Sequence, residues 1–247
     1  MGFADHFSAQ SRQYAAYRPT YPPELAAYLA CISPGRDLAW DAATGQGQAA
    51  RLLAPEFRRV LATDASAAQL ASAEPCDALE FRVAEAADSG LPDHSCDLIT
   101  VAQAAHWFAL DRFYAEVRRV LRPRGVIAIW GYVLLQTRDA RIDGLLQEFQ
   151  DVGVGPYWPE GREILERRYE TLPFPFDRVE TPPFFMRARW TREDLLGYVS
   201  SWSAVARYRQ QQNADPLPGF AGDIRRAWPD GKVIDIEWPL YMLVGRV

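Results

Sequence analysis

The chain has 247 residues, enough for one large domain or for one domain with a cap, and 49% of them are hydrophobic. Its formal net charge of −5 argues against nucleic acid as a partner, because a surface that binds phosphate is basic. Three scattered cysteines form neither a disulfide framework nor a metal site, which favours a reducing cytoplasm and predicts no bound metal. We expect no signal peptide and no membrane span, since the N-terminus lacks an apolar run and no apolar stretch reaches roughly eighteen residues.

Short apolar runs alternate with helical stretches over the first half of the chain. A helix is predicted to begin at Pro22 and Pro23, because proline fits a first helical turn. A second helix is predicted to begin near Ser66, a favourable N-cap. Another is predicted over residues 110–121, where apolar residues form one stripe. The apolar runs are continuous, as in strands buried on both faces of a parallel sheet, and they cover residues 38–40, 60–63, 79–83, 97–102 and 126–130. This alternation predicts an open α/β sheet.

The pattern changes after about residue 135. Residues 153–185 are rich in proline and aromatic side chains, and we expect them to form a cap over the edge of the sheet. Thr191 is predicted to begin a further helix, with Asp194 at the reciprocal capping position. Residues 233–247 are partly alternating and rich in β-forming residues, which predicts a terminal strand or hairpin.

A glycine turn follows the first apolar run, in the sequence Asp41-Ala-Ala43-Thr-Gly45-Gln-Gly47. Glycines lack a Cβ, so a ligand can approach the backbone closely at the carboxyl ends of the strands. Asp64 ends the next run nineteen positions after Gly45, which suits a grip on a ribose diol. The two glycines are also compatible with a plain strand–helix connection, and they fit a relaxed NAD fingerprint as well as a site for S-adenosylmethionine (SAM). A P-loop is excluded, because no Gly-Lys-Ser/Thr sequence follows.

These residues resemble the class I SAM-dependent methyltransferases of the branch called methyltransferase type 11. The resemblance covers the glycine turn, the ribose-binding acid Asp64, the adenine position at Glu85-Ala86, and the sequences CDLITVAQAAHWF and VRRVLRPRGVIAIWGY. In the glycine turn Ala43 replaces a glycine of the family, and alanine is less suited to a positive φ. It implies a Rossmann-like α/β fold, with a seven-stranded, mostly parallel sheet, helices on both faces and a small C-terminal cap insertion. It also implies SAM as the cofactor and S-adenosylhomocysteine (SAH) as its product. The implied cofactor residues are Tyr14, Arg18, Asp41, Ala43, Gly45, Gly47, Asp64, Ala65, Glu85, Ala86 and Gln103.

Further motifs along nearly the whole chain are similar to those of trans-aconitate methyltransferases. They include YRPTYP at 17–22, AHWF at 105–108, GPYW at 155–158 and the segment around Trp202. On this resemblance we divide a single methyltransferase domain into an N-terminal lid segment (1–35), a SAM-binding core (36–135), a substrate cap (136–232) and a terminal strand (233–247).

The acceptor determines what the protein must supply. A carboxylate acceptor is its own nucleophile, whereas a hydroxyl or an amine benefits from a general base. His106 follows the fourth strand and is the candidate catalytic residue, which either packs and orients or acts as a base. Arg18 and Arg162 are candidates for holding an acidic group, because a guanidinium suits a bidentate carboxylate contact. The candidate substrate residues are Trp107, Tyr132, Tyr157, Trp158, Arg162 and Trp202, although aromatic side chains more often build a core.

The sequence leaves three function classes open. The first is a SAM-dependent methyltransferase for a small molecule, with a carboxylate-bearing acceptor implied by the resemblance. The second is an NAD(P)-dependent oxidoreductase. The absence of a Tyr-x-x-x-Lys pair argues against it, and Lys232 is the only lysine. The third is a catalytically silent SAM-binding protein. The sequence does not determine whether the protein is a monomer or a homodimer, nor which atom of the acceptor is methylated.

Overall fold

The computed structural model describes residues 19–74 and 76–247. Its residues group into two compact units. The sheet unit comprises Tyr21–Tyr132, Glu163–Phe184 and Leu240–Val247, and the helical unit includes Val133–Arg162 and Phe185–Pro239.

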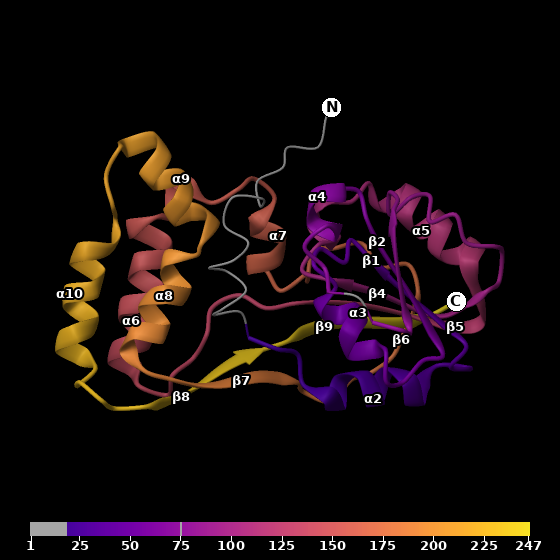
Figure 1. Ribbon diagram of the computed structural model, residues 1–247, viewed down its shortest axis with the longest axis horizontal. Helices are drawn as coiled ribbons and strands as arrows, with labels where there is room; N and C mark the ends of the chain where they lie inside the picture. Colours follow the sequence, from indigo (N-terminus) through magenta and orange to yellow (C-terminus); the bar gives the residue numbers. More distant parts are fainter. Residues whose placement is uncertain (1–18, 75) are drawn as a thin grey trace. The chain divides into compact units, whose positions relative to one another are not determined.

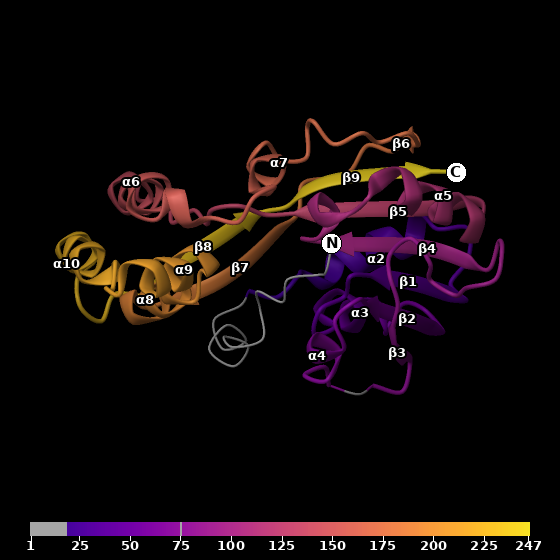
Figure 2. The same ribbon diagram turned by 90° about the horizontal axis from the view of Figure 1, so that it is seen from above.

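Seven strands form one sheet in the sheet unit, in the order β3-β2-β1-β4-β5-β9-β6. The strands are β1 Leu38–Ala42, β2 Arg59–Asp64, β3 Leu79–Val83, β4 Cys96–Ala102, β5 Leu121–Gly131, β6 Asp177–Arg178 and β9 Tyr241–Arg246. Strands β1 to β5 pair in parallel, whereas β9 runs antiparallel to β5 and β6 (Figure 2). The strand order reverses between β1 and β4, and open α/β sheets bind ligands outside the carboxyl ends at such a point. The predicted mostly parallel α/β sheet is confirmed.

Helices cover both faces of this sheet, with α5 above it and α2 below it in Figure 1. Helix α5 buries the predicted apolar stripe, including Phe113, Val117 and Val120. Ser66 caps α4 as predicted, since its side chain accepts a hydrogen bond from the Gln69 N–H. The helices before β5 are α2 Pro23–Ile32, α3 Gln48–Leu53, α4 Ala67–Leu70, η2 Ala105–Trp107 and α5 Leu110–Val120.

Strand β5 begins at Leu121, earlier than the predicted start at Val126. Leu121 pairs with Cys96, and the register then shifts before Val126 pairs with Leu98. The backbone between them is irregular, with a φ of 66° at Arg124. The early start therefore comes from a single pairing before a bulge, which a run of apolar residues does not reveal.

The helical unit contains a two-stranded antiparallel sheet and several helices. Helix α10 packs against both α6 and α8 (Figure 1). Thr191 and Asp194 form the predicted capping box at the start of α8. The elements are α6 Ala140–Glu148, η3 Phe149–Gly153, η4 Gly155–Tyr157, β7 Phe185–Trp190, α8 Arg192–Ser200, α9 Ser203–Gln212, α10 Leu217–Ala227 and β8 Ile234–Pro239.

Two segments differ from the expected organisation. Residues 163–184, expected within the substrate cap, group with the sheet unit, where Tyr169 is fully buried. The end of the chain forms two strands and not one terminal strand, because β8 pairs with β7 whereas β9 pairs with β5. Leu240 separates the two strands, and its N–H donates to the Phe184 carbonyl at 2.9 Å.

Candidate active site

The glycine turn connects β1 to α3 through several residues with positive φ. Ala43 has a φ of 54°, Gly45 of 58° and Gly47, the N-cap of α3, of 80°. A Cβ on Gly47 would lie 2.8 Å from a ring carbon of Phe81, so packing requires a glycine here. A Cβ on Gly45 would meet, among the described residues, only the Gln69 Oε1 at 3.9 Å. The Gly45 backbone therefore borders space that a ligand can enter.

Ala43 adopts the positive φ that the family's glycine would adopt. This conformation costs an alanine roughly 1–2 kcal/mol. Backbone hydrogen bonds hold the turn in place: the Thr44 N–H donates to the Thr63 carbonyl at 2.9 Å, and the Gly47 N–H donates to the Thr44 carbonyl at 3.0 Å. The shape of the turn is therefore kept despite the substitution.

Asp41 lies beneath the turn and is fully buried. Its Oδ2 accepts a hydrogen bond from the Thr44 hydroxyl at 2.6 Å, and its Oδ1 accepts one from the Thr100 hydroxyl at 2.7 Å. Burial raises the pKa of this carboxyl to about 6, although both hydroxyls favour the charged form. Asp41 thus braces the turn against β1 and β4.

Asp64 ends β2 beside the glycine turn, as its spacing predicts. Its Oδ2 accepts the Gly45 N–H at 2.8 Å and its Oδ1 accepts the Ser66 N–H at 2.8 Å. An ionised carboxylate has about four acceptor positions, so each oxygen retains capacity for a ligand hydroxyl. Next to it, the Ala84 N–H donates to the Asp64 carbonyl at 3.1 Å, which places the loop after β3 beside the end of β2. The predicted residues Ala65, Glu85 and Ala86 lie on these two loops.

Gln103 follows β4 with a φ of 59°. Its backbone N–H donates to the Trp130 carbonyl at 2.9 Å, and its Nε2 donates to the Tyr132 carbonyl at 2.9 Å. The Oε1 is buried and has no hydrogen-bond partner within the described part of the chain. An unsatisfied buried acceptor is unfavourable by about 1–3 kcal/mol, so this oxygen suits a ligand that brings an N–H or O–H group.

These features fit SAM at the carboxyl ends of β1, β2 and β4. The open backbone at Gly45 allows close approach, Asp64 can accept from ribose hydroxyls, and the Gln103 Oε1 can accept from an ammonium group. The predicted cofactor residues Tyr14 and Arg18 lie outside the described residues.

His106 lies in η2, directly after β4, and its ring is held on two sides. Its Nδ1 lies 3.2 Å from the Tyr169 hydroxyl, and its ring centroid lies 4.7 Å from that of Trp107, which is 45% exposed. Tyr169 is fully buried, and burial raises the pKa of its phenol above the ordinary value. Sequence reasoning missed Tyr169, because it lies 63 residues from His106 and no motif marks it.

The remaining predicted substrate residues fall in both units. In the helical unit the Arg162 guanidinium lies 3.5 Å from the Trp158 ring centroid, and its Nη2 contacts the Gln150 Oε1 at 3.3 Å. The Trp158 and Trp202 rings lie 5.5 Å apart, so three predicted residues form one cluster. Tyr157 contacts Tyr208, with ring centroids 4.8 Å apart. Tyr132 is buried in the sheet unit and holds Gln103 through its carbonyl.

No group of three or more His, Cys, Asp or Glu side chains in residues 19–74 and 76–247 is arranged to hold a metal ion. Within these ranges, no helix has both the length and the apolar character needed to cross a bilayer. The three thiols are free; Cys31 and Cys76 are exposed and Cys96 is buried.

Comparison with known proteins agrees with this site. The methyltransferase domain family matches residues 40–129. A predicted methyltransferase of Dictyostelium discoideum is 34% identical over 252 residues, covering 99% of this chain and 95% of its relative. A probable S-adenosylmethionine-dependent methyltransferase of Saccharomyces cerevisiae is 31% identical over 244 residues, covering 84% of this chain and 83% of its relative. The solved structure of a predicted type II methyltransferase from Anaeromyxobacter dehalogenans has a TM-score of 0.88 and 40% identity, over 93% of this chain and 97% of that one.

Two of these relatives exceed 30% identity along most of their length, and both are named as methyltransferases. The oxidoreductase alternative is therefore wrong. The chain belongs to the SAM-dependent methyltransferases, and SAM is its cofactor.

Proposed function

We propose that this enzyme transfers the methyl group of SAM to a carboxylate oxygen of a small molecule. The observation that carries the proposal is the 3.2 Å contact between the Tyr169 hydroxyl and the His106 Nδ1. We infer from this contact which nitrogen of the imidazole carries the proton.

The direction of this hydrogen bond follows from the burial of Tyr169. A buried hydroxyl proton without an acceptor is unfavourable by about 1–3 kcal/mol. Among the described residues, the His106 Nδ1 is the only hydrogen-bond partner of this hydroxyl. Tyr169 therefore donates, Nδ1 accepts, and a neutral His106 carries its proton on Nε2.

A histidine with its proton on Nε2 is a donor at that nitrogen. Such a group suits an anionic acceptor, whose oxygen it can hold, and it is the wrong tautomer for removing a proton through Nε2. Bound SAM supplies a methyl group on a sulfonium, which needs no further activation. A carboxylate needs no base, so His106 orients the acceptor and excludes water beside it.

The residue assignments at the cofactor are part of the same proposal. Asp64 holds the ribose hydroxyls, Gln103 accepts from the ammonium group, and Asp41 acts through the shape of the turn. The remaining predicted contacts with SAM are Tyr14, Arg18, Ala43, Gly45, Gly47, Ala65, Glu85 and Ala86.

The acceptor side follows the resemblance to trans-aconitate methyltransferases, which implies an acidic substrate. Arg162 would hold a second charged group, because its guanidinium is already oriented by the Trp158 ring. The aromatic side chains proposed to line the acceptor pocket are Trp107, Tyr132, Tyr157, Trp158 and Trp202. Three free thiols are consistent with the proposed cytoplasmic location.

The test is a radiolabelled-methyl transfer screen over polycarboxylates, phenols and amines. Carboxyl methyl esters release labelled methanol in mild alkali, whereas methyl ethers and methylamines do not, so the product identifies the acceptor atom. We expect His106→Ala to lower the rate less than about tenfold, because positioning alone is lost, whereas loss of a general base costs roughly 10²–10⁴-fold. His106→Gln places an amide N–H near the Nε2 position and should recover part of the loss.

His94→Gln is the matched control, since His94 precedes β4 at the opposite end of that strand from His106. Alkali-stable products, or equal losses above about a hundredfold in both His106 variants, would refute the carboxylate acceptor and indicate a base. Full activity in Arg162→Ala would remove Arg162 from the acceptor pocket.

A further inference from the structure

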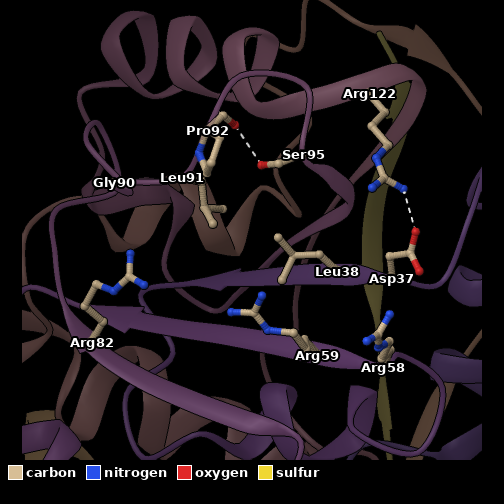
Figure 3. Close-up of a pocket in the computed structure, with 10 residues that line it drawn as sticks. All are labelled: Asp37, Leu38, Arg58, Arg59, Arg82, Gly90, Leu91, Pro92, Ser95 and Arg122. Atoms are coloured by element: carbon tan, nitrogen blue, oxygen red, sulfur yellow. Dashed lines mark hydrogen bonds and ion pairs between the residues drawn. The ribbon is translucent and has the colours of Figure 1, made fainter.

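A cavity of about 570 Å³ lies against strands β1, β2 and β3 in the sheet unit (Figure 3). The loop that precedes β4 forms its other wall, with Leu91 directed toward the strands. Four arginines and one carboxylate are among its lining residues: Arg58, Arg59, Arg82, Arg122 and Asp37. Basic side chains thus cluster at this cavity, although the chain as a whole has a net charge of −5.

The cavity is separate from the candidate active site. Side chains alternate between the faces of a strand, so Phe81 lies against Gly47 of the glycine turn while Glu80 and Arg82 point to the opposite face. No predicted cofactor or substrate residue is among the residues that line the cavity. A ligand here would therefore not compete with SAM by contact.

The ion pairs do not neutralise all the arginines at the cavity. Arg122 lies between two carboxylates, since its Nη1 lies 3.1 Å from Asp37 and 2.8 Å from the buried Asp97. Arg58, Arg59 and Arg82 lie along the strands, and the last two share the single carboxylate of Glu80, at 3.2 and 2.5 Å. Arg58 forms no ion pair with a carboxylate of the described residues.

Four lining arginines are thus opposed by three carboxylates, those of Asp37, Asp97 and Glu80, which leaves one positive charge in excess. Arg82 is also fixed in place, since its Nη1 donates to the Ser89 carbonyl at 3.3 Å. A held guanidinium offers a fixed fork of N–H groups, which matches the geometry of a phosphate or a carboxylate.

We propose that this cavity binds a small anion that carries phosphate or carboxylate groups. Arg58, Arg59 and Arg82 would donate to it from the strands. The volume falls within the range of about 300–1,000 Å³ that is usual for small-molecule sites. Leu38 and Leu91 add an apolar part to the lining, which suits a ligand with a carbon skeleton.

Calorimetric titration of the full chain with pyrophosphate and with citrate tests the proposal, at constant ionic strength near neutral pH. We expect Arg59→Gln and Arg82→Gln each to weaken binding about tenfold or more, because each removes a charge-assisted hydrogen bond. Glu80→Gln should tighten binding several-fold, because it removes the carboxylate that competes for the same two arginines. Structural damage would not produce a tighter site.

Arg178→Gln is the matched control, since Arg178 is an exposed arginine on β6 at the other edge of the sheet. SAH affinity, measured in parallel, shows that each variant is folded and keeps this test separate from that of the methyl acceptor. Binding of either anion with the expected pattern supports the proposal, and the preferred anion distinguishes phosphate from carboxylate. Absence of binding by both, equal weakening in Arg178→Gln, or binding of an oligonucleotide without either small anion would overturn it.

Discussion

Asp41 should make the stability of this protein decrease as the pH rises through the acid range. Its pKa is raised from 3.8 to about 6, mainly by burial. The folded state then binds the proton more tightly than the unfolded state, so the contribution of Asp41 to stability is complete below about pH 4 and is lost as the pH rises to about 6. A shift of about two pKa units corresponds to roughly 3 kcal/mol. Asp41→Asn removes this titration, so its free energy of unfolding should rise relative to the parent by up to about 3 kcal/mol between pH 4 and pH 7.

Urea denaturation at closely spaced pH values, followed by tryptophan fluorescence, measures this difference. Glu148→Gln is the control, because it removes an exposed carboxylate on α6. Parallel stability curves for Asp41→Asn and the parent would refute the raised pKa. A variant whose stability falls relative to the parent as the pH rises would instead show that the hydrogen bonds from Thr44 and Thr100 outweigh the burial of charge.

Three other predictions concern the same site. Asp64→Asn should weaken SAH binding about tenfold or more in calorimetry. It should also lower the melting temperature, because Asp64 accepts the Gly45 N–H, and an unchanged SAH affinity would place the ribose contact elsewhere. Gly47→Ala should lower the free energy of unfolding by about 1–3 kcal/mol, because the φ of Gly47 is 80° and a Cβ there would meet an aromatic ring. Gly45→Ala should chiefly weaken SAH binding, and the opposite pattern would reverse the roles assigned to the two glycines. Tyr169→Phe should move part of the His106 proton from Nε2 to Nδ1, and unchanged nitrogen chemical shifts of the imidazole would show that the phenol does not set the tautomer.

The sheet could be predicted because its central strands are buried on both faces. Every residue of β1 is buried, and so is nearly all of β4, which made both visible as continuous apolar runs. The division of the chain's end into β8 and β9 could not be predicted, because both strands are β-rich and only their partners, β7 and β5, distinguish them. Local composition does not specify long-range pairing.

The site divides in the same way. Asp64 and the glycine turn lie on consecutive strand ends, so their spacing along the chain was enough to assign both to one ligand site. The structure adds a direct contact, 2.8 Å from the Asp64 Oδ2 to the Gly45 nitrogen. Tyr169 reaches His106 from an irregular segment with consecutive residues of positive φ, Arg168 at 56° and Tyr169 at 60°. No periodicity leads to such a position, so only the folded chain reveals the pair.

Gly131 shows how the motif at the end of β5 and the segment that carries Tyr169 depend on each other. A Cβ at this position would lie 2.5 Å from a methyl carbon of Leu165, 3.0 Å from the Tyr169 ring and 3.1 Å from the Gln103 Oε1. Leu165 belongs to α7 Arg162–Glu166, which begins the segment that packs over the strand. The glycine in the sequence Trp-Gly-Tyr therefore gives that segment the room it needs to bring a phenol to His106. Its absent side chain also keeps space beside the one buried acceptor of Gln103, so the same position serves the proposed cofactor contact and the proposed acceptor contact.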